Sequence, residues 1–289
     1  MNVDLIVDAQ ATLGEGPFWH PRENRLYWVD IEGRTLHVHD PEGQPDTVYD
    51  AGCRVGAAVP RRSGGLVLAT EFGFETFDPE TGARKPIADP ESDRPDHRFN
   101  DGKCDAAGRF WAGTMCLAKE PDAALYVLET DGSVRRVIEG VTTSNGLGWS
   151  LDRKTMYYID TPTMQVAAFD YDETAGTLAR RRVVVTFPEG VGRPDGMTVD
   201  AEGMLWIAHW AGARVSRWHP GTGALLATVP VPAGNVSSCA FGGPNLDRLY
   251  VTTARHKLDP DDLARYPHTG GLFVLEPGVC GLPAGEYGG

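Results

Sequence analysis

LYWVD, at Leu26–Asp30, is the first of six short apolar runs that each carry Leu or an aromatic residue near the centre. The other five runs are centred on Leu68, Trp111, Tyr158, Trp206 and Tyr250. They recur with a mean period of roughly 44 residues, which is typical of β-propeller blades. Apolar and polar positions alternate within the runs, and this alternation predicts strands.

Polar turns rich in Gly, Pro and Asp follow most of these runs. Examples are Asp78–Gly82, Glu129–Gly132 and His219–Gly223. Such turns join antiparallel strands into hairpins, so each repeat is expected to form a four-stranded sheet. The chain of 289 residues fits about six such sheets. The prediction is an all-β, six-bladed β-propeller that spans residues 1–289 as a single domain.

Composition narrows the classes of partner and compartment. A net charge of −13 and the absence of a basic stripe argue against nucleic-acid binding and favour a neutral small molecule over an anionic one. The beginning MNVDLIVDAQ has no leader character, and no run approaches the length of a membrane span. Five cysteines without CxxC spacing argue against disulfides and a zinc-thiolate site. We expect a cytoplasmic protein without membrane contact and, because a closed ring leaves few free sheet edges, a monomer.

Oxygen-bearing residues recur at one point of the repeat. Glu15, Asn100, Asn145 and Asp195 lie about 11 to 13 residues before the strand markers of their repeats, and Gly or Asp-Gly follows each of them. The first strand of every propeller blade lines the central channel, so equivalent residues converge on the axis. Two carboxylates and two amides in one buried pocket require a positive charge among them. This arrangement predicts a divalent cation site.

Each of these motifs also has a simpler interpretation. Asn-Gly and Asp-Gly are common tight-turn dipeptides, and any one of them alone would be read as a turn. The recurrence of ligand-type residues in four repeats favours the metal site. Arg98 lies two residues before Asn100, on the same face of an extended segment, where its guanidinium could hold substrate oxygens or form a salt bridge at the rim. His209 follows the run at Trp206 and is expected to pack inside its blade.

Several segments together resemble the regucalcin/gluconolactonase family, also called the senescence marker protein family. The similarity runs from about Leu13 to the C-terminus. The segments that carry it are Gly14–Pro17, Arg98–Lys103, Gly108–Met115, Ser144–Leu147, Pro194–Met197 and Cys239–Gly243.

This resemblance implies a six-bladed propeller that acts as a sugar lactonase with one divalent metal on its axis. It assigns the metal to Glu15, Asn145 and Asp195, substrate contacts to Arg98 and Asn100, and the role of general base to Asp195. The cation would polarise the carbonyl of a lactone such as gluconolactone or a pentonolactone. Asp195 would take the proton of the attacking water, with hydroxide held by the cation as the other source of the nucleophile.

The metal and the substrate stay open at this level. Ca²⁺, Mg²⁺, Mn²⁺, Zn²⁺ and Fe²⁺ all accept oxygen ligands. Segment 116–124 is shorter than the acidic lid of the family, and its charged residues Lys119 and Glu120 are no clear match for the lid residue that helps to hold the sugar. Two other functions also fit a propeller with an axial cation, namely hydrolysis of organophosphates such as phosphotriesters and calcium binding without catalysis.

Overall fold

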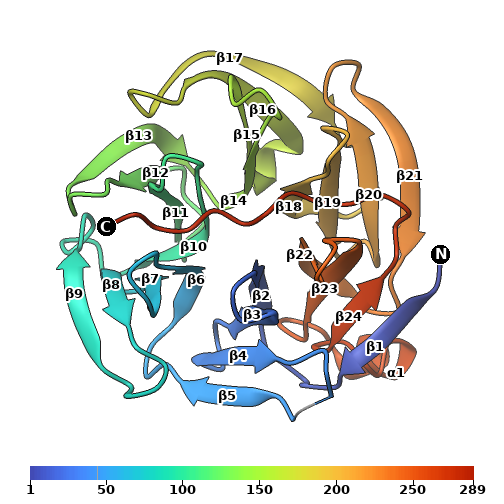
Figure 1. Ribbon diagram of the computed structural model, residues 1–289. Helices are drawn as coiled ribbons and strands as arrows, with labels where there is room; N and C mark the ends of the chain where they lie inside the picture. Colours follow the sequence, from blue (N-terminus) through green and yellow to red (C-terminus); the bar gives the residue numbers. More distant parts are fainter. Residues whose placement is uncertain (44) are drawn as a thin grey trace.

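The computed structural model describes residues 1–43 and 45–289 and shows six four-stranded antiparallel sheets arranged in a ring (Figure 1). The predicted six-bladed β-propeller is therefore confirmed. The first three sheets that follow the chain comprise β2 (Gly14–His20), β3 (Arg25–Asp30), β4 (Thr35–His39) and β5 (Thr47–Asp50); β6 (Val55–Pro60), β7 (Leu66–Thr70), β8 (Gly73–Phe77) and β9 (Arg84–Ala88); and β10 (His97–Cys104), β11 (Phe110–Cys116), β12 (Ala123–Leu128) and β13 (Val134–Val141).

Two further sheets continue the same order around the ring. They comprise β14 (Ser144–Trp149), β15 (Thr155–Asp160), β16 (Gln165–Asp172) and β17 (Thr177–Thr186), and then β18 (Arg193–Val199), β19 (Leu205–Trp210), β20 (Arg214–His219) and β21 (Ala224–Pro230). A 3-10 helix, η1 (Thr161–Thr163), follows β15, and a short α-helix, α1 (Pro260–Arg265), precedes the last strand.

The sixth sheet joins the two ends of the chain. It has the order β1 (Val3–Val7), β24 (Leu272–Leu275), β23 (Arg248–Ala254) and β22 (Asn235–Gly242). Strand β1 pairs antiparallel with β24, so that Val3 lies opposite Leu275. This pairing closes the ring with hydrogen bonds, which is how propellers protect their sheet edges.

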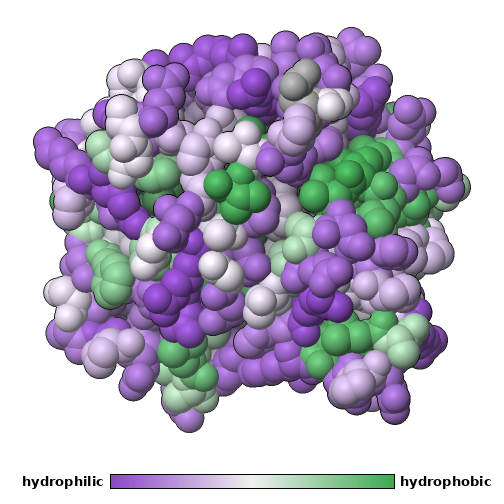
Figure 2. Space-filling model, turned by 90° about the horizontal axis from the view of Figure 1, so that it is seen from below, coloured by the Kyte–Doolittle hydropathy of each residue, from purple (hydrophilic) through white to green (hydrophobic). Residues whose placement is uncertain are grey.

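The core lies between neighbouring blades and is built largely from the second strands. Trp28, Trp111, Trp206 and Tyr250 are all fully buried, as expected for the repeating apolar runs. Two of these indoles also have buried acceptors, because Trp111 Nε1 donates to Asp105 at 2.9 Å and Trp206 Nε1 donates to Asp200 at 3.0 Å. The outer side of the ring is mainly hydrophilic, with small separate hydrophobic patches (Figure 2).

The inner strands β2, β6, β10, β14, β18 and β22 contact one another around the central channel. Each of them carries a register shift where it pairs with the second strand of its blade. The shift falls between Glu15 and Phe18 in β2 and between Pro194 and Met197 in β18. Bulges of this kind change the direction in which side chains point. The irregular backbone of each inner strand therefore coincides with the positions at which the sequence predicts metal ligands.

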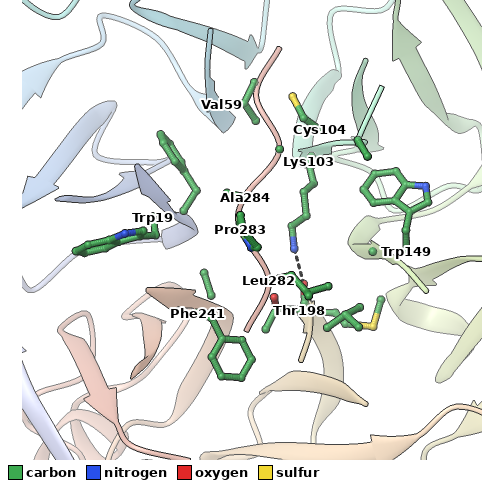
Figure 3. Close-up of a pocket in the computed structure, with 18 of the residues that line it drawn as sticks. Trp19, Val59, Lys103, Cys104, Trp149, Thr198, Phe241, Leu282, Pro283 and Ala284 are labelled. Atoms are coloured by element: carbon green, nitrogen blue, oxygen red, sulfur yellow. Dashed lines mark hydrogen bonds between the residues drawn. The ribbon is translucent and has the colours of Figure 1, made fainter. Parts of the chain in front are cut away.

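The C-terminal segment crosses one end of the channel (Figure 1). It bonds first to the blade of β18 through Ala201 N and Cys280 O at 2.8 Å, and later to the blade of β6 through Tyr287 N and Pro60 O at 2.8 Å. Beneath it lies a cavity of about 350 Å³. Lys103 extends into this cavity under Leu282, Pro283 and Ala284, and its Nζ donates to the carbonyl of Met197 at 2.8 Å (Figure 3).

None of the helices in the described residues is long and apolar enough to span a membrane.

Candidate metal and lactone site

A second cavity, of about 630 Å³, opens at the other end of the channel. It lies at the beginnings of the inner strands, whereas the cavity under the C-terminal segment lies near their ends. All five residues that the sequence singles out line it, namely Glu15, Arg98, Asn100, Asn145 and Asp195. Each of them is at most 7% exposed. The structure thus brings together residues that are up to 180 positions apart in the chain.

Three buried carboxyl groups influence one another inside the channel: Glu15 and Asp195 line this cavity, and Asp101 lines the cavity at the other end. Burial, followed by the negative charge of Asp101, raises the pKa of Glu15 to about 8. Burial also raises the pKa of Asp195 well above its usual range, and the charges of Glu15 and Asp101 add to this effect. Burial likewise raises the pKa of Asp101, which the repeat pattern did not select. The three groups favour protonation because the protein supplies too little positive charge among them.

A hydrogen-bond chain fixes the two amide side chains. Asn145 Nδ2 donates to Thr161 Oγ1 at 2.7 Å, and this hydroxyl donates to the carbonyl of Pro194 at 2.8 Å. The bond to Thr161 turns Asn145 Oδ1 toward Asn100, whose Nδ2 donates to it at 3.2 Å. Asn100 Nδ2 also donates to the carbonyl of Ser144 at 2.7 Å. Thr161 therefore positions the oxygen of Asn145, and its role was not visible in the repeat pattern because it lies in η1, outside the inner strands.

Arg98 has donors left over. Its Nη1 donates to the carbonyl of Phe99 at 2.9 Å and to Asn100 Oδ1 at 2.7 Å. Its Nε is buried and has no hydrogen-bond partner within the described chain. Burial lowers the pKa of Arg98 to about 10, so the group is still cationic near neutral pH. A buried cation with an unused donor on a cavity wall is suited to binding oxygen atoms of a ligand.

The glycines that follow the predicted ligands allow close approach of neighbouring blades, and the turn interpretation of these dipeptides is wrong. Gly146 lies within β14 and Gly196 within β18. A Cβ at Gly146 would lie 2.5 Å from Met197 Cβ, and a Cβ at Gly196 would lie 2.7 Å from Ser238 Cα. Adjacent inner strands therefore pack backbone against backbone here, which draws Asn145 and Asp195 toward the axis.

Carboxylates at the ends of two second strands hold the segments that enter the inner strands. Asp30 accepts hydrogen bonds from the amides of Thr12 and Leu13, each at 2.8 Å, just before Glu15. Asp160 accepts from the amide of Thr143 at 2.9 Å, just before Asn145. The sequence carried a signal for this contact, because the runs at Trp28 and Tyr158 both end in Asp.

The segment 116–124 contributes to the rim of the cavity. Lys119 lines the cavity and contacts Thr143 Oγ1 through its Nζ at 3.3 Å. Glu120 is exposed and does not line the cavity as the structure describes it. Trp210 and His256 also line the cavity, and the centroids of their rings are 6.4 Å apart. The segment at the lid position of this chain therefore contributes a basic residue, Lys119, to the cavity.

A divalent cation fits the residues at the base. Glu15, Asn145 and Asp195 offer one amide and two carboxylate oxygens, which is the donor set that hard and borderline cations accept. The raised pKa values of Glu15 and Asp195 mark a site that a cation would stabilise in its ionised form. Metal ligands are usually held in place by a further hydrogen bond to another protein group, and Thr161 provides this bond to Asn145.

A different group of metal-type side chains lies beside β10 and β11. His97, Cys116 and Asp122 place their donor atoms within 4.8 Å of one another. His97 Nδ1 also lies 3.2 Å from Glu91 and its Nε2 lies 3.3 Å from Asp122. These ion-pair contacts account for the burial of His97 between two carboxylates. The group is separate from the set that the repeat predicts.

Comparison with known proteins identifies the family. The sequence profile described as "SMP-30/Gluconolactonase/LRE-like region" matches residues 13–255. Regucalcin from Danio rerio is 40% identical over 293 residues, which cover 100% of this chain and 99% of that protein.

Two solved structures share the fold. A calcium-binding protein, regucalcin, from Agrobacterium tumefaciens superposes with a TM-score of 0.94 at 29% identity and covers 98% of this chain and 96% of its own. A gluconolactonase from Xanthomonas campestris superposes with a TM-score of 0.77 at 25% identity and covers 95% of this chain and 89% of its own. The chain belongs to the SMP-30/gluconolactonase family, as its segments indicate.

Proposed function

We propose that this protein hydrolyses a sugar lactone to the aldonic acid at the cavity that contains Glu15 and Asp195. The observation that carries the proposal is the meeting of Glu15, Asn145 and Asp195 in a cavity whose wall also includes the buried cation Arg98. Membership in a family that includes gluconolactonases supports the reaction type. The volume of about 630 Å³ lies in the usual range for small-molecule sites.

Glu15, Asn145 and Asp195 would hold one divalent cation in this proposal. When bound, the cation supplies a Lewis acid for the lactone carbonyl oxygen and for the negative charge that develops on it. The ion is any of Ca²⁺, Zn²⁺, Mn²⁺, Mg²⁺ or Fe²⁺, since all of them accept this donor set.

The side chains of the protein bind and orient the lactone. Arg98 directs its remaining guanidinium donors at sugar oxygens, and Asn100 supports Arg98 by accepting the hydrogen bond from Nη1 at 2.7 Å. Because these donors are buried, they do not have to give up strong hydrogen bonds to water when a sugar hydroxyl binds to them. The lactone carbonyl then faces the carboxylates at the base.

Asp195 moves the proton in this mechanism. Its carboxylate accepts a proton from a water molecule as the water oxygen adds to the carbonyl carbon. The ring C–O bond then breaks, and the proton held by Asp195 passes to the ring oxygen, which becomes a hydroxyl group. The products are one aldonic acid and no other fragment, because the ester is internal to the ring. Removing this base is expected to cost about 10²- to 10⁴-fold in rate.

Substitutions test these assignments. Asp195→Ala should abolish lactone turnover and weaken metal binding, measured by acid release from the metal-loaded protein and by titration calorimetry of the metal-free protein with the cation. Arg98→Ala should raise the apparent KM and leave the metal content at one equivalent per chain. Full activity in Asp195→Ala would refute the base, and loss of metal from Arg98→Ala would mean that Arg98 supports the cation site instead of the sugar.

Calcium binding without catalysis is the second candidate. The Agrobacterium relative is described as a calcium-binding protein, and the oxygen donors of Glu15, Asn145 and Asp195 suit Ca²⁺. If this candidate is correct, Ca²⁺ should raise the unfolding temperature while every sugar lactone is hydrolysed only at its spontaneous rate. Hydrolysis that changes with the identity of the added metal would argue against it.

A further inference from the structure

The cavity carries a charge opposite to that of the whole molecule. The chain has 27 basic and 40 acidic residues. The cavity lining has five basic residues, Arg54, Arg98, Lys119, Arg193 and Lys257, and only three acidic ones, Glu15, Glu32 and Asp195. The expectation of a neutral ligand rests on the overall acidity of the chain, which does not describe the charged residues that line this cavity.

The three acidic residues have other partners. Glu32 pairs with Arg54 at 2.9 Å, and Arg54 also lies 3.5 Å from Glu71. Glu15 and Asp195 belong to the proposed cation site. Within residues 1–43 and 45–289, the three exposed rim residues Lys119, Arg193 and Lys257 form no ion pair. These three rim residues therefore have no ion-pair partner in the described chain, whereas Arg98 lies deeper, near the negative charges of Glu32 and Glu15.

These charges act on one another. The pKa of Lys119 is lowered first by burial and then by the positive charges of Arg98 and Lys257, while the charge of Asp195 raises it and that of Arg193 lowers it. The pKa of His256 is also lowered, first by burial and then by Lys257. Mutual repulsion of this kind costs free energy unless an anion occupies the space between the groups.

We propose that the preferred lactone carries an anionic substituent, a carboxylate or a phosphate ester, that binds between Lys119, Arg193 and Lys257. This inference rests on the proposed lactonase function. The lactone carbonyl would face Glu15 and Asp195 at the base, and the far end of the sugar would reach the basic rim. The ring would lie against the flat side chains of Trp210 and His256, which line the same cavity.

The experiment compares three lactones on the metal-loaded enzyme: neutral glucono-lactone, a lactone of glucaric acid that carries a carboxylate, and 6-phosphogluconolactone. The expected kcat/KM is at least tenfold higher for one or both anionic lactones. A preference shared by both indicates recognition of charge alone, whereas a preference for one identifies carboxylate or phosphate. Rising salt concentration should reduce the preference, because the rim is exposed.

Charge reversal tests the residues. In the double variant Lys119→Glu, Lys257→Glu, the ratio of kcat/KM for anionic over neutral lactone should fall at least tenfold. Lys85→Glu, a charge reversal at an exposed lysine of β9, is the matched control and should leave the ratio unchanged. A ratio near one in the original protein, or a ratio that the double variant does not change, would overturn the proposal.

A binding measurement separates this proposal from the lactonase function itself. Glucarate and gluconate, the open-chain acids, cannot be hydrolysed and differ by one carboxylate. Titration calorimetry on the metal-loaded protein should show at least tenfold tighter binding of glucarate, lost in the double variant. This result would uphold the anion site even if no lactone were turned over. Equal affinities would overturn it even if glucono-lactone were a good substrate.

Discussion

At the residue scale, Thr161 gives the clearest example of a side chain that acts through another. Its hydroxyl joins Asn145 to the backbone of the next blade, with hydrogen bonds of 2.7 and 2.8 Å. An amide can rotate its oxygen and nitrogen ends, so a ligand oxygen needs such a partner to face the cation.

Replacement of Thr161 should therefore weaken metal binding. We expect Thr161→Val to lower the affinity of the channel site for its cation by about tenfold, with kcat recovered at saturating metal, because the Asn145 amide loses its acceptor. Titration calorimetry of the metal-free protein measures the affinity. Thr163→Val, on the same 3-10 helix but exposed, is the control. Equal affinities of the Thr161 variant and the original protein would show that Asn145 is held in other ways.

At this scale, the sequence was sufficient to predict the residues that line the site, but not the residues that hold them in position. Glu15, Arg98, Asn100, Asn145 and Asp195 were selected from one offset in the repeat and from the family segments, and all five line one cavity. Thr161 and Asp101 were missed. Thr161 comes from outside the repeating position, and Asp101 was noted only as the residue that follows Asn100, although it lies buried in β10. Their roles depend on contacts between blades, which no local pattern encodes.

At the scale of elements, the contact between neighbouring inner strands determines where the ligands lie. We expect Gly196→Ala to destabilise the protein by about 1–3 kcal/mol and to weaken metal binding, because the new methyl group would collide with the backbone of Ser238. Urea unfolding and metal titration measure the two effects. Gly234→Ala, where the nearest atom would be 3.4 Å away, is the control. A stable Gly196 variant with normal metal affinity would contradict this view of the strand contact.

A buried histidine inside the blade of β18 predicts a pH dependence of stability. His209 contacts Val191 O at 2.8 Å and Ser216 Oγ at 2.6 Å, and burial lowers its pKa from 6.5 to about 4. As the pH falls below 6.5, the unfolded chain binds a proton at this residue before the folded protein does. The contribution of His209 to the free energy of unfolding is therefore fully present above pH 6.5. It is lost progressively toward pH 4 and amounts to roughly 3 kcal/mol.

Urea unfolding between pH 4 and 7.5 tests this prediction. His209→Gln should show a smaller loss of stability over this range, whereas His219→Gln, at a less buried histidine of β20, should keep the loss. If His209→Gln loses stability with the same slope as the original protein, His209 is not the group responsible. The placement of this histidine inside its blade was expected from its position after the run at Trp206, and the structure confirms it.

At the scale of the whole molecule, both ends of the chain complete the ring. Strand β1 closes the last blade, and the C-terminal segment covers the end of the channel opposite the proposed site. Tyr287 anchors that segment, because it is 3% exposed and its hydroxyl donates to the carbonyl of Glu129 at 2.7 Å.

Tyr287→Ala should lower the free energy of unfolding by about 3–5 kcal/mol, because it removes a buried aromatic ring and leaves a cavity between blades. Tyr287→Phe keeps the ring and should cost only about 1 kcal/mol through the lost hydrogen bond. Urea denaturation of the three proteins measures both values. A loss below about 1 kcal/mol in the Ala variant would show that the C-terminal segment contributes little to the stability of the ring.

The period of the apolar runs was sufficient to predict the ring and the number of blades, because every blade needs the same buried second strand. The closure was not predictable in the same way. β1 lies before the first repeat, so the period of the apolar runs does not assign it to a blade. It pairs with β24 because the last three strands, β22 to β24, leave one sheet edge free. The basic rim of the cavity could not be predicted from the composition either, because the net charge of −13 is a sum over the whole chain.

We propose that this propeller is a metal-dependent sugar lactonase. The most direct test strips the protein of metal and follows acid release from glucono-, xylono-, galactono- and arabinonolactones, as well as the anionic lactones, with Ca²⁺, Mg²⁺, Mn²⁺, Zn²⁺ or Fe²⁺ restored singly. We predict release above the spontaneous rate that is absent from the stripped protein and returns with at least one metal. Spontaneous rates for every combination, or full activity in the stripped protein, would contradict the claim.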